Sequence, residues 1–437
     1  MLETLRNAFK IEDIRKRIGY TFLMLIVIRI GSQLPIPCVN SEVFANWFAN
    51  QGGDAFSFLD AITGGSFYQM SVFALNITPY ITSSIIIQLL TIAIPKLEEL
   101  QKDGEEGRKK ITKITRYLSV ILALVEAIAM AIGFGRSGYL DKFNVINVLL
   151  VVTTLTAGST ILMWIGERIT ERGVGNGISI VLTINIISRI PADLTALFDQ
   201  FIKGKTIAKG VLAAAIIAAI ILVTVVFVVI LQDAVRKIPV QYAKKMQGRK
   251  MVGGQTSNIP LKVNTSGVIP IIFAQSIMQF PIIICSFIGY NGTGVWAEIL
   301  KGLNSGYWCK PSQPIYSLGL LLYIVLIVFF AYFYTSITFN PLMIADNMKK
   351  QGGFIPGIRP GKPTSDYLNK ILNYIVFIGA IGLIIVSVIP YFFNGVFGAS
   401  VSFGGTSLII IVSVVLETMK QVESQMLVRN YKGFLED

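Results

Sequence analysis

The sequence of 437 residues contains no histidine and only three cysteines, Cys38, Cys285 and Cys309. Without histidine the chain cannot build a His-ligated zinc or haem site, a Ser-His-Asp triad or a histidine proton relay. The cysteines form no Cys-x-x-Cys motif, and isolated cysteines mostly act as small hydrophobic residues. These absences favour a protein without metal, cofactor or catalytic nucleophile.

Charged residues are also scarce, at 14% of the chain, whereas hydrophobic residues make up 53%. A soluble protein is expected to have about 25% charged residues, and a membrane-spanning helix needs roughly 20 apolar residues. Uncharged runs of that length lie at 61–95, 143–166, 210–232, 263–297, 311–345 and 371–416, and weaker spans lie at 18–38, 114–134 and 174–194. The last long run contains Asn394-Gly395 and is predicted to form two spans. The sequence therefore predicts an all-α membrane protein with ten spans.

The excess of 38 Lys and Arg over 25 Asp and Glu follows a pattern along the chain. Most of the basic residues lie in alternate gaps between the predicted spans, including 96–116, 233–262 and 338–370. Because basic loops stay on the cytoplasmic side, both termini are predicted to be cytoplasmic. The gap 189–209 carries four basic residues on the opposite side and is the weak point of this pattern.

The gap 39–73 contains no Lys or Arg. Its apolar residues, among them Phe56, Phe58 and Ile62, precede Gly64-Gly65. This stretch is too short to cross a bilayer and too apolar for water. It is predicted to be a short helix tucked into the protein from outside.

Catalytic motifs are absent from the sequence. Gly204-Lys205-Thr206 has the ending of a phosphate-binding loop, but Asp199 replaces the first glycine of that motif. The charges inside predicted spans are Arg29, Glu126 and Glu417, of which only Glu126 lies mid-span without an explanation. The chain is therefore predicted not to be an enzyme, and a ten-span secondary transporter for a small solute is one function open to such a membrane protein.

Polar uncharged residues mark two spans. Thr82, Ser83 and Gln88 lie in one, and Gln275 and Gln279, four residues apart on one helix face, lie in the other. Since polar groups avoid lipid, both helices should face protein or water. Ordinary helix–helix hydrogen bonding explains the pattern equally well.

Short motifs along the chain resemble the SecY family, whose members are the central channel subunit of the Sec protein translocase. These motifs are Arg29–Ser32 with Pro35–Pro37, Pro79–Ile81 with Gln88–Leu90, Gly107–Ile111, Ile169–Gly173 with Gly175–Ser179, Tyr242–Lys245, Pro260–Asn264 with Gly267–Pro270, Phe339–Pro341, Ala345–Asn347, Pro356–Gly361 and Phe403–Ser407. They occur in the family's order from residue 29 to 407.

The resemblance implies a protein-conducting channel of two pseudo-symmetric inverted halves, 1–195 and 196–437, each with five helices. A ring of aliphatic side chains would close its waist, namely Ile77, Ile81, Ile178, Leu182, Ile272 and Ile410. Residues 54–70 would form a short plug helix. The helices around 74–95 and 265–287 would form a lateral gate, with Thr82, Ser83, Gln88, Gln275 and Gln279 as its polar residues.

The resemblance also implies partners and a location. Such channels translocate unfolded secretory polypeptides carrying a signal sequence and release transmembrane segments sideways into lipid. The loops 233–262 and 338–370 would dock the ribosome or the motor ATPase SecA through Arg249, Lys250 and Arg359, by pairing with carboxylate or ribosomal RNA phosphate. For Arg359, phospholipid headgroups are the alternative contact. Small subunits like SecE and SecG would complete the assembly in the bacterial cytoplasmic membrane.

Overall fold

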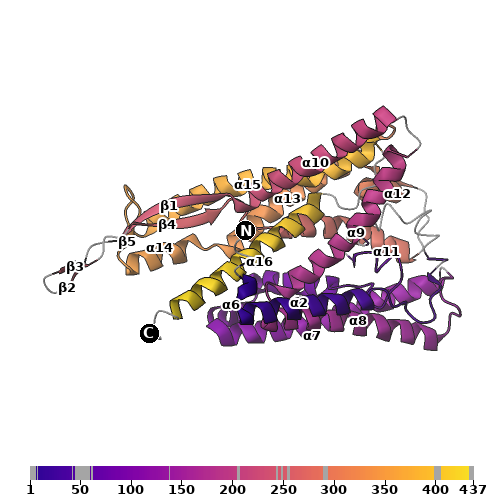
Figure 1. The fold of residues 1–437 in the computed structure, drawn as a ribbon, viewed down its shortest axis with the longest axis horizontal. Helices are drawn as coiled ribbons and strands as arrows, with labels where there is room; N and C mark the ends of the chain where they lie inside the picture. The colour runs from indigo at the N-terminus through magenta and orange to yellow at the C-terminus, as the bar shows by residue number, and fades with distance from the viewer. Residues whose placement is uncertain are drawn as a thin grey trace.

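The structure is a computed structural model that describes most of the chain. Residues outside the described part are 1–5, 7, 42, 45–59, 61–62, 137, 204–206, 243–244, 248–249, 253–255, 289–293, 398–404 and 433–437. Long helices run roughly along the longest axis of the molecule (Figure 1). A small sheet lies at one end, the sheet end, and helix α12 (Val295–Leu303) lies at the other, the α12 end.

Each of the ten predicted spans overlaps one helix. These are α2 (Glu12–Gly31), α5 (Thr78–Ala93), α7 (Gly104–Arg136), α8 (Val145–Arg172), α9 (Gly177–Phe201), α10 (Ile207–Asp233), α11 (Ile269–Ile288), α13 (Leu318–Thr338), α15 (Lys362–Phe397) and α16 (Gly405–Lys432). Within the described residues, six stretches are by themselves long and apolar enough to cross a bilayer, and a bent pair of helices adds a seventh. The α11 segment Ile269–Ile282 is a shorter apolar helix.

That bent pair consists of α5 and α6 (Pro95–Lys102). Ile94 between them is extended, with φ −113° and ψ 108°. A proline disfavours the helical conformation of the residue before it, so Pro95 ends α5 and begins α6. The chain then turns into the long helix α7.

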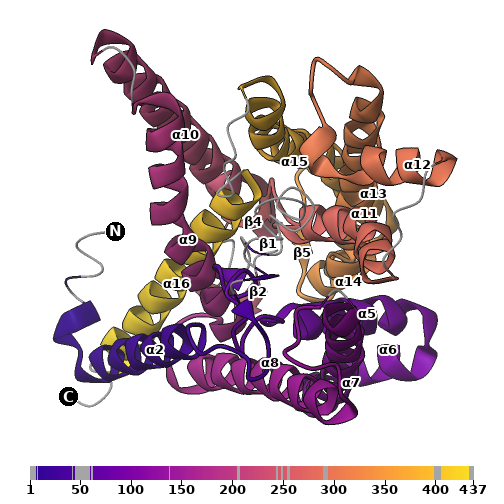
Figure 2. The same ribbon diagram turned by 90° about the vertical axis from the view of Figure 1, so that its right-hand side faces the viewer.

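The helices pack as two groups around a centre (Figure 2). Helices α5, α7, α8 and α9 pack in sequence, with α2 against α8, and α11, α13, α15, α16 and α10 form the second group. The first group buries a cluster that includes Phe44, Phe67, Met70 and Leu155, and the second buries one that includes Tyr323. Contacts between α9 and α16 and between α7 and α11 join the groups.

The two basic loops contain structure that the sequence analysis did not predict. Strands β1 (Val235–Tyr242) and β4 (Thr256–Lys262) pair antiparallel, and β5 (Gly353–Phe354) adds to β1. Strands β2 (Lys245–Gln247) and β3 (Lys250–Val252) pair near the tip. Ile238 and Val240 alternate with exposed residues and pack, with Leu261, against α14 (Pro341–Lys350) and α15. This alternation is the period of a half-buried strand, and it was present in the sequence.

Candidate functional site

A cavity of about 800 Å³ lies at the centre of the bundle and is lined by residues from both groups of helices. Its walls come from α5, α7, α8 and α9 on one side and from α11, α13 and α16 on the other. A cavity at the junction of two helix groups is where membrane transport proteins hold what they move. The described residues around it are therefore the candidate functional site.

Several aliphatic side chains line this cavity, and five of them are positions of the predicted ring. We call these five the aliphatic collar, comprising Ile81, Ile178, Leu182, Ile272 and Ile410. They come from α5, α9, α11 and α16, so both groups contribute. Leu182 and Ile410 are buried and the other three are half-buried. All five belong to the ring of six expected from the resemblance.

The structure does not bring the sixth residue, Ile77, to the cavity wall. Ile77 is the residue before α5, and its side chain is fully buried in a cluster with Ile28, Phe73 and Leu162. Its neighbours belong to the first helix group. In this structure Ile77 therefore supports the wall that carries Ile81 rather than lining the cavity.

The start of α9 is fixed by a local cap. The Asn176 side chain accepts hydrogen bonds from the backbone N–H of Ile178, at 3.1 Å, and of Ser179, at 3.4 Å. Gly177 packs so closely on α8 that an added Cβ would lie 1.9 Å from the carbonyl oxygen of Gly166. Cap and contact together place Ile178 and Leu182, four residues apart, on the cavity side of α9.

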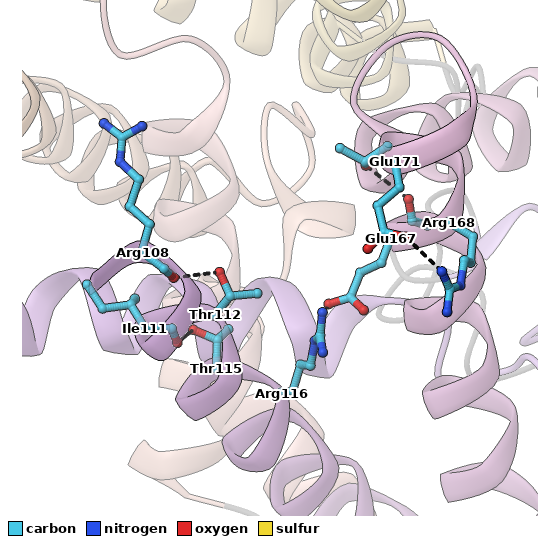
Figure 3. A network of polar contacts seen from close by, with 10 residues as sticks. Arg108, Ile111, Thr112, Thr115, Arg116, Glu167, Arg168 and Glu171 are labelled. Carbon is cyan, nitrogen blue, oxygen red and sulfur yellow. Dashed lines mark hydrogen bonds and ion pairs between the residues drawn. The ribbon is translucent and has the colours of Figure 1, made fainter. Parts of the chain in front are cut away.

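An ion pair crosses from α7 to α8 at the cavity wall (Figure 3). Arg116 Nε lies 2.6 Å from Glu167 Oε1, and a second pair joins Arg168 to Glu171 within α8 at 2.8 Å. Arg116, Glu167 and Glu171 all line the cavity. Sequence reasoning missed the cross-helix pair, because nothing in the local pattern relates residues 51 positions apart. The cavity thus combines an aliphatic collar with a charged wall.

The predicted gate residues bond mainly within their own helix group. Thr82 and Ser83 donate to the backbone oxygens of Thr78, at 3.0 Å, and Pro79, at 2.7 Å. Gln275 donates to the Tyr391 hydroxyl on α15 at 3.0 Å. Helix α11 meets the first group by packing against α7.

The two remaining gate residues differ in exposure. Gln88 is exposed and lines the cavity, whereas Gln279 is buried. Polar residues of α5 and α11 thus lie at the cavity and inside the helix packing.

Of the predicted docking residues, only Arg359 is described with its side chain. Arg249 lies outside the described residues, and Lys250 is described only as the first residue of β3. Arg359 is exposed between Gly357 and Gly361, both at positive φ, and its carbonyl accepts a hydrogen bond from Thr364 Oγ1 at 2.8 Å. The backbone is therefore held while the guanidinium faces solvent.

The predicted plug, 54–70, is described only at residues 60 and 63–70. These residues lie between α2 and α5, and the chain there runs near the centre of the α12 end (Figure 2). The chain near residue 70 is hydrogen-bonded to the residues that follow α2. Ile36 N–H donates to Met70 O at 2.8 Å, and Val72 N–H donates to Leu34 O at 2.9 Å.

Fold and site together define a multi-pass helical membrane protein with a central cavity between two helix groups. The SecY family model matches residues 71–419 of this chain. The protein translocase subunit SecY of Bacillus subtilis (strain 168) is 42% identical over the full length of both chains, and that of Streptomyces galbus is 43% identical, also over the full length of both. This chain belongs to the SecY family, and with these relatives it is a protein of the bacterial cytoplasmic membrane.

Solved structures share the fold at lower identity. One is a SecY protein whose plug domain is described as stabilising the closed state of the translocation channel and maintaining a membrane seal. It has a TM-score of 0.68 and 20% identity, covering 94% of this chain and 92% of that one. Sec61 in the canine ribosome-channel complex has a TM-score of 0.63 and 20% identity, with 94% and 93% covered. The likeness confirms the predicted all-α channel fold.

Proposed function

We propose that this chain is a protein-conducting channel that translocates unfolded secretory polypeptides and releases transmembrane segments laterally into lipid. The observation that carries the proposal is the aliphatic collar, in which four helices from both groups present aliphatic side chains to one cavity. The names of its full-length relatives, protein translocase subunits, support it.

The chemistry of the collar suits a passage for chains of any sequence. Aliphatic groups exclude water, and with it ions, from a narrow constriction. They form no directional bonds, so they can move apart around an extended polypeptide without breaking specific contacts. This proposal assigns no catalysis to the chain, and the energy for transport would come from partners such as the motor ATPase SecA or the translating ribosome.

Site-specific crosslinking tests the function. Ile272 lines the cavity, whereas Ile277 on the same helix α11 is 49% exposed and does not belong to the cavity lining. A secretory precursor stalled during uptake into reconstituted vesicles is expected to crosslink to Ile272→Cys and not to Ile277→Cys. Equal crosslinking at both positions, or none at Ile272→Cys, would contradict the proposal.

The division into halves 1–195 and 196–437, with a lateral gate between α5 and α11, belongs to the same proposal. Separate buried clusters in the two helix groups support it, although α9 continues past residue 195 to Phe201. In this arrangement Gln88 would face a passing chain, and Gln275 would hold α11 to α15 while the groups separate.

Docking of the ribosome or SecA is assigned to the surface around Arg359. Its support is a fixed loop carrying an exposed guanidinium, whose fork geometry suits carboxylate and phosphate oxygens. Arg359→Glu is expected to abolish precursor uptake while leaving thermal unfolding unchanged. Lys350→Glu, an exposed charge reversal on α14, is the control that should retain uptake.

Small subunits like SecE and SecG, and cytoplasmic placement of both termini, complete the proposal. The orientation is supported by the basic sheet end, where β1 and α14 carry Arg236, Lys237, Lys349 and Lys350. Labelling of single cysteines at Arg236 and at Lys301 in sealed vesicles should react from opposite sides. Reaction from the same side would overturn the orientation.

A further inference from the structure

One face of α9 changes from aliphatic to polar just beyond the collar. Asn185, Ser188, Arg189 and Asp193 follow Leu182 at helical spacing and form what we call the polar row. With a rise of about 1.5 Å per residue, Arg189 lies roughly 10 Å beyond Leu182 along α9. The polar row therefore faces the α12 end of the channel.

The polar row binds the chain that connects α2 to α5. Arg189 Nη2 lies 2.9 Å from Asp60 Oδ2. Ser188 Oγ, whose hydroxyl donates to Asn185 O at 2.7 Å, also lies 3.4 Å from the Gly64 carbonyl oxygen. Asn185 Nδ2 donates to Asn76 Oδ1 at 3.1 Å. We call the described residues 60 and 63–76 the connecting segment, and α9 thus contacts it near its start, at its glycine turn and near its end.

The turn at Gly64 in the connecting segment packs directly against the backbone of α9. Gly64 has φ +67°, and a Cβ there would lie 2.5 Å from the backbone oxygen of Asn185. The neighbouring Gly65 also has positive φ, +85°, but a Cβ on it would meet only Arg189 Nη1, at 3.5 Å. Only glycine at position 64 allows this close approach.

Asp60 is buried almost completely, with 1% of its side chain exposed. Its other oxygen accepts the Tyr68 backbone N–H at 3.0 Å. Burial raises the pKa of the Asp60 carboxyl, and the charge of Arg189 and the bond from Tyr68 oppose that rise. Arg189 also approaches Asp193 Oδ1 at 3.9 Å, so one guanidinium lies between two carboxyl groups. A carboxylate buried this deeply depends on its cationic partner.

The two parts of the connecting segment are held by different forces. Phe67, Met70 and Leu75 pack in the apolar cluster of the first helix group, together with Phe44. Asp60 and Gly64 are attached to α9 through the polar row. The start of the segment can therefore detach by breaking the ion pair of Asp60 and the polar contact of Gly64, while its later part stays packed.

The connecting segment includes the described part of the predicted plug, 54–70, and a plug domain that maintains a membrane seal is described for a solved SecY structure. We propose that in this chain Arg189 is the positioning residue that holds the start of this segment over the α12 side of the aliphatic collar, through its ion pair with Asp60. This inference rests on the proposed channel function. The seal would have two layers, the collar and the segment attached one to two turns beyond it. Opening of this second layer by an entering polypeptide would then require the ion pair between Arg189 and Asp60 to break.

Ion conductance of the resting channel tests this role. Arg189→Gln and Asp60→Asn, in the full chain reconstituted with its partner subunits, are each expected to raise resting conductance at least severalfold while precursor uptake is retained. Arg189→Lys keeps the charge and should leak less than Arg189→Gln. Lys203→Gln is the matched control, because Lys203 pairs with Asp199 at the same end of α9 but both are exposed. Unchanged resting conductance in Arg189→Gln would overturn the proposal.

A reversible crosslink makes the test independent of folding. Asp60→Cys with Arg189→Cys, in a chain whose Cys38, Cys285 and Cys309 are replaced by Ser, would be bridged by a thiol crosslinker that reductant cleaves. Bridging is expected to block precursor uptake, and reductant should restore it. Full uptake through the bridged protein would overturn the proposal. If the stalled precursor still crosslinks to Ile272→Cys while these results fail, the channel function stands and only the role of Arg189 is lost.

Discussion

Helix α9 places two different kinds of side chain along the channel, Ile178 and Leu182 in the collar and Asn185, Ser188 and Arg189 in the polar row. The collar side chains meet partners from other helices without directional bonds. The polar row makes specific contacts with particular atoms of the connecting segment. In the proposed resting channel, closure would need no fixed geometry at the collar but would depend on the specific contacts of the polar row beyond it.

The largest expected effect is on stability and comes from disturbing the contact between the connecting segment and α9. Gly64→Ala should lower the free energy of unfolding by about 2–4 kcal/mol, because it adds strain at positive φ and a clash with Asn185 O. Gly65→Ala also has a positive φ, but its Cβ would make only an ordinary contact, 3.5 Å from Arg189 Nη1, so this variant measures the strain without the clash. Thermal unfolding of both variants in detergent gives the difference. Equal destabilisation would show that the contact between Gly64 and α9 contributes nothing.

Smaller losses of stability are expected from substitutions at two neighbouring positions of α9, one in the polar row and one in the collar. Asn185→Ala removes the hydrogen bond to Asn76 inside the protein and should cost about 1–2 kcal/mol. Leu182→Met, a volume-conserving change in the collar, should cost less than about 1.5 kcal/mol and leave resting conductance unchanged. Denaturant titration together with conductance checks both. A conductance increase in Leu182→Met would contradict the tolerance assigned to the collar.

The smallest effect concerns the charged wall of the cavity. Arg116→Gln removes the ion pair with Glu167, whose side chains are 45% and 17% exposed, and should cost about 0.2–1 kcal/mol. Arg108→Gln on the same helix is the control for loss of one positive charge. The difference between the two variants should shrink in high salt, because a partly exposed pair is screened. A salt-independent difference would assign the effect of Arg116 to packing.

The number and order of the spans could be predicted from the sequence, because apolar length in a bilayer leaves few alternatives. The ends of the helices could not be predicted, because α7 and α15 begin in charged sequence well before their apolar residues. Charge marks where the membrane ends and says little about where a helix ends. The alternation of Ile238 and Val240 predicts a strand at β1, whereas the basic residues of the same loop indicate only a docking surface.

Contacts between distant residues were the least predictable part of the site. The resemblance predicted which residues form the collar. The side-chain orientation of Ile77 depends on the turn before α5, and that of Gln275 depends on its hydrogen bond to the Tyr391 hydroxyl of α15. One signal for the polar row was in the sequence. Arg189 stands in the gap 189–209, which breaks the basic pattern of the loops, and the structure pairs it with Asp60.

The most direct test of the central claim measures whether the collar parts around a polypeptide. Ile81 on α5 and Ile410 on α16 line the same cavity from the two helix groups. With cysteines at both positions, a short thiol crosslinker is expected to join them in the resting channel and to fail when a precursor is stalled inside. Crosslinking at the same yield in both states would contradict passage of the polypeptide through the collar.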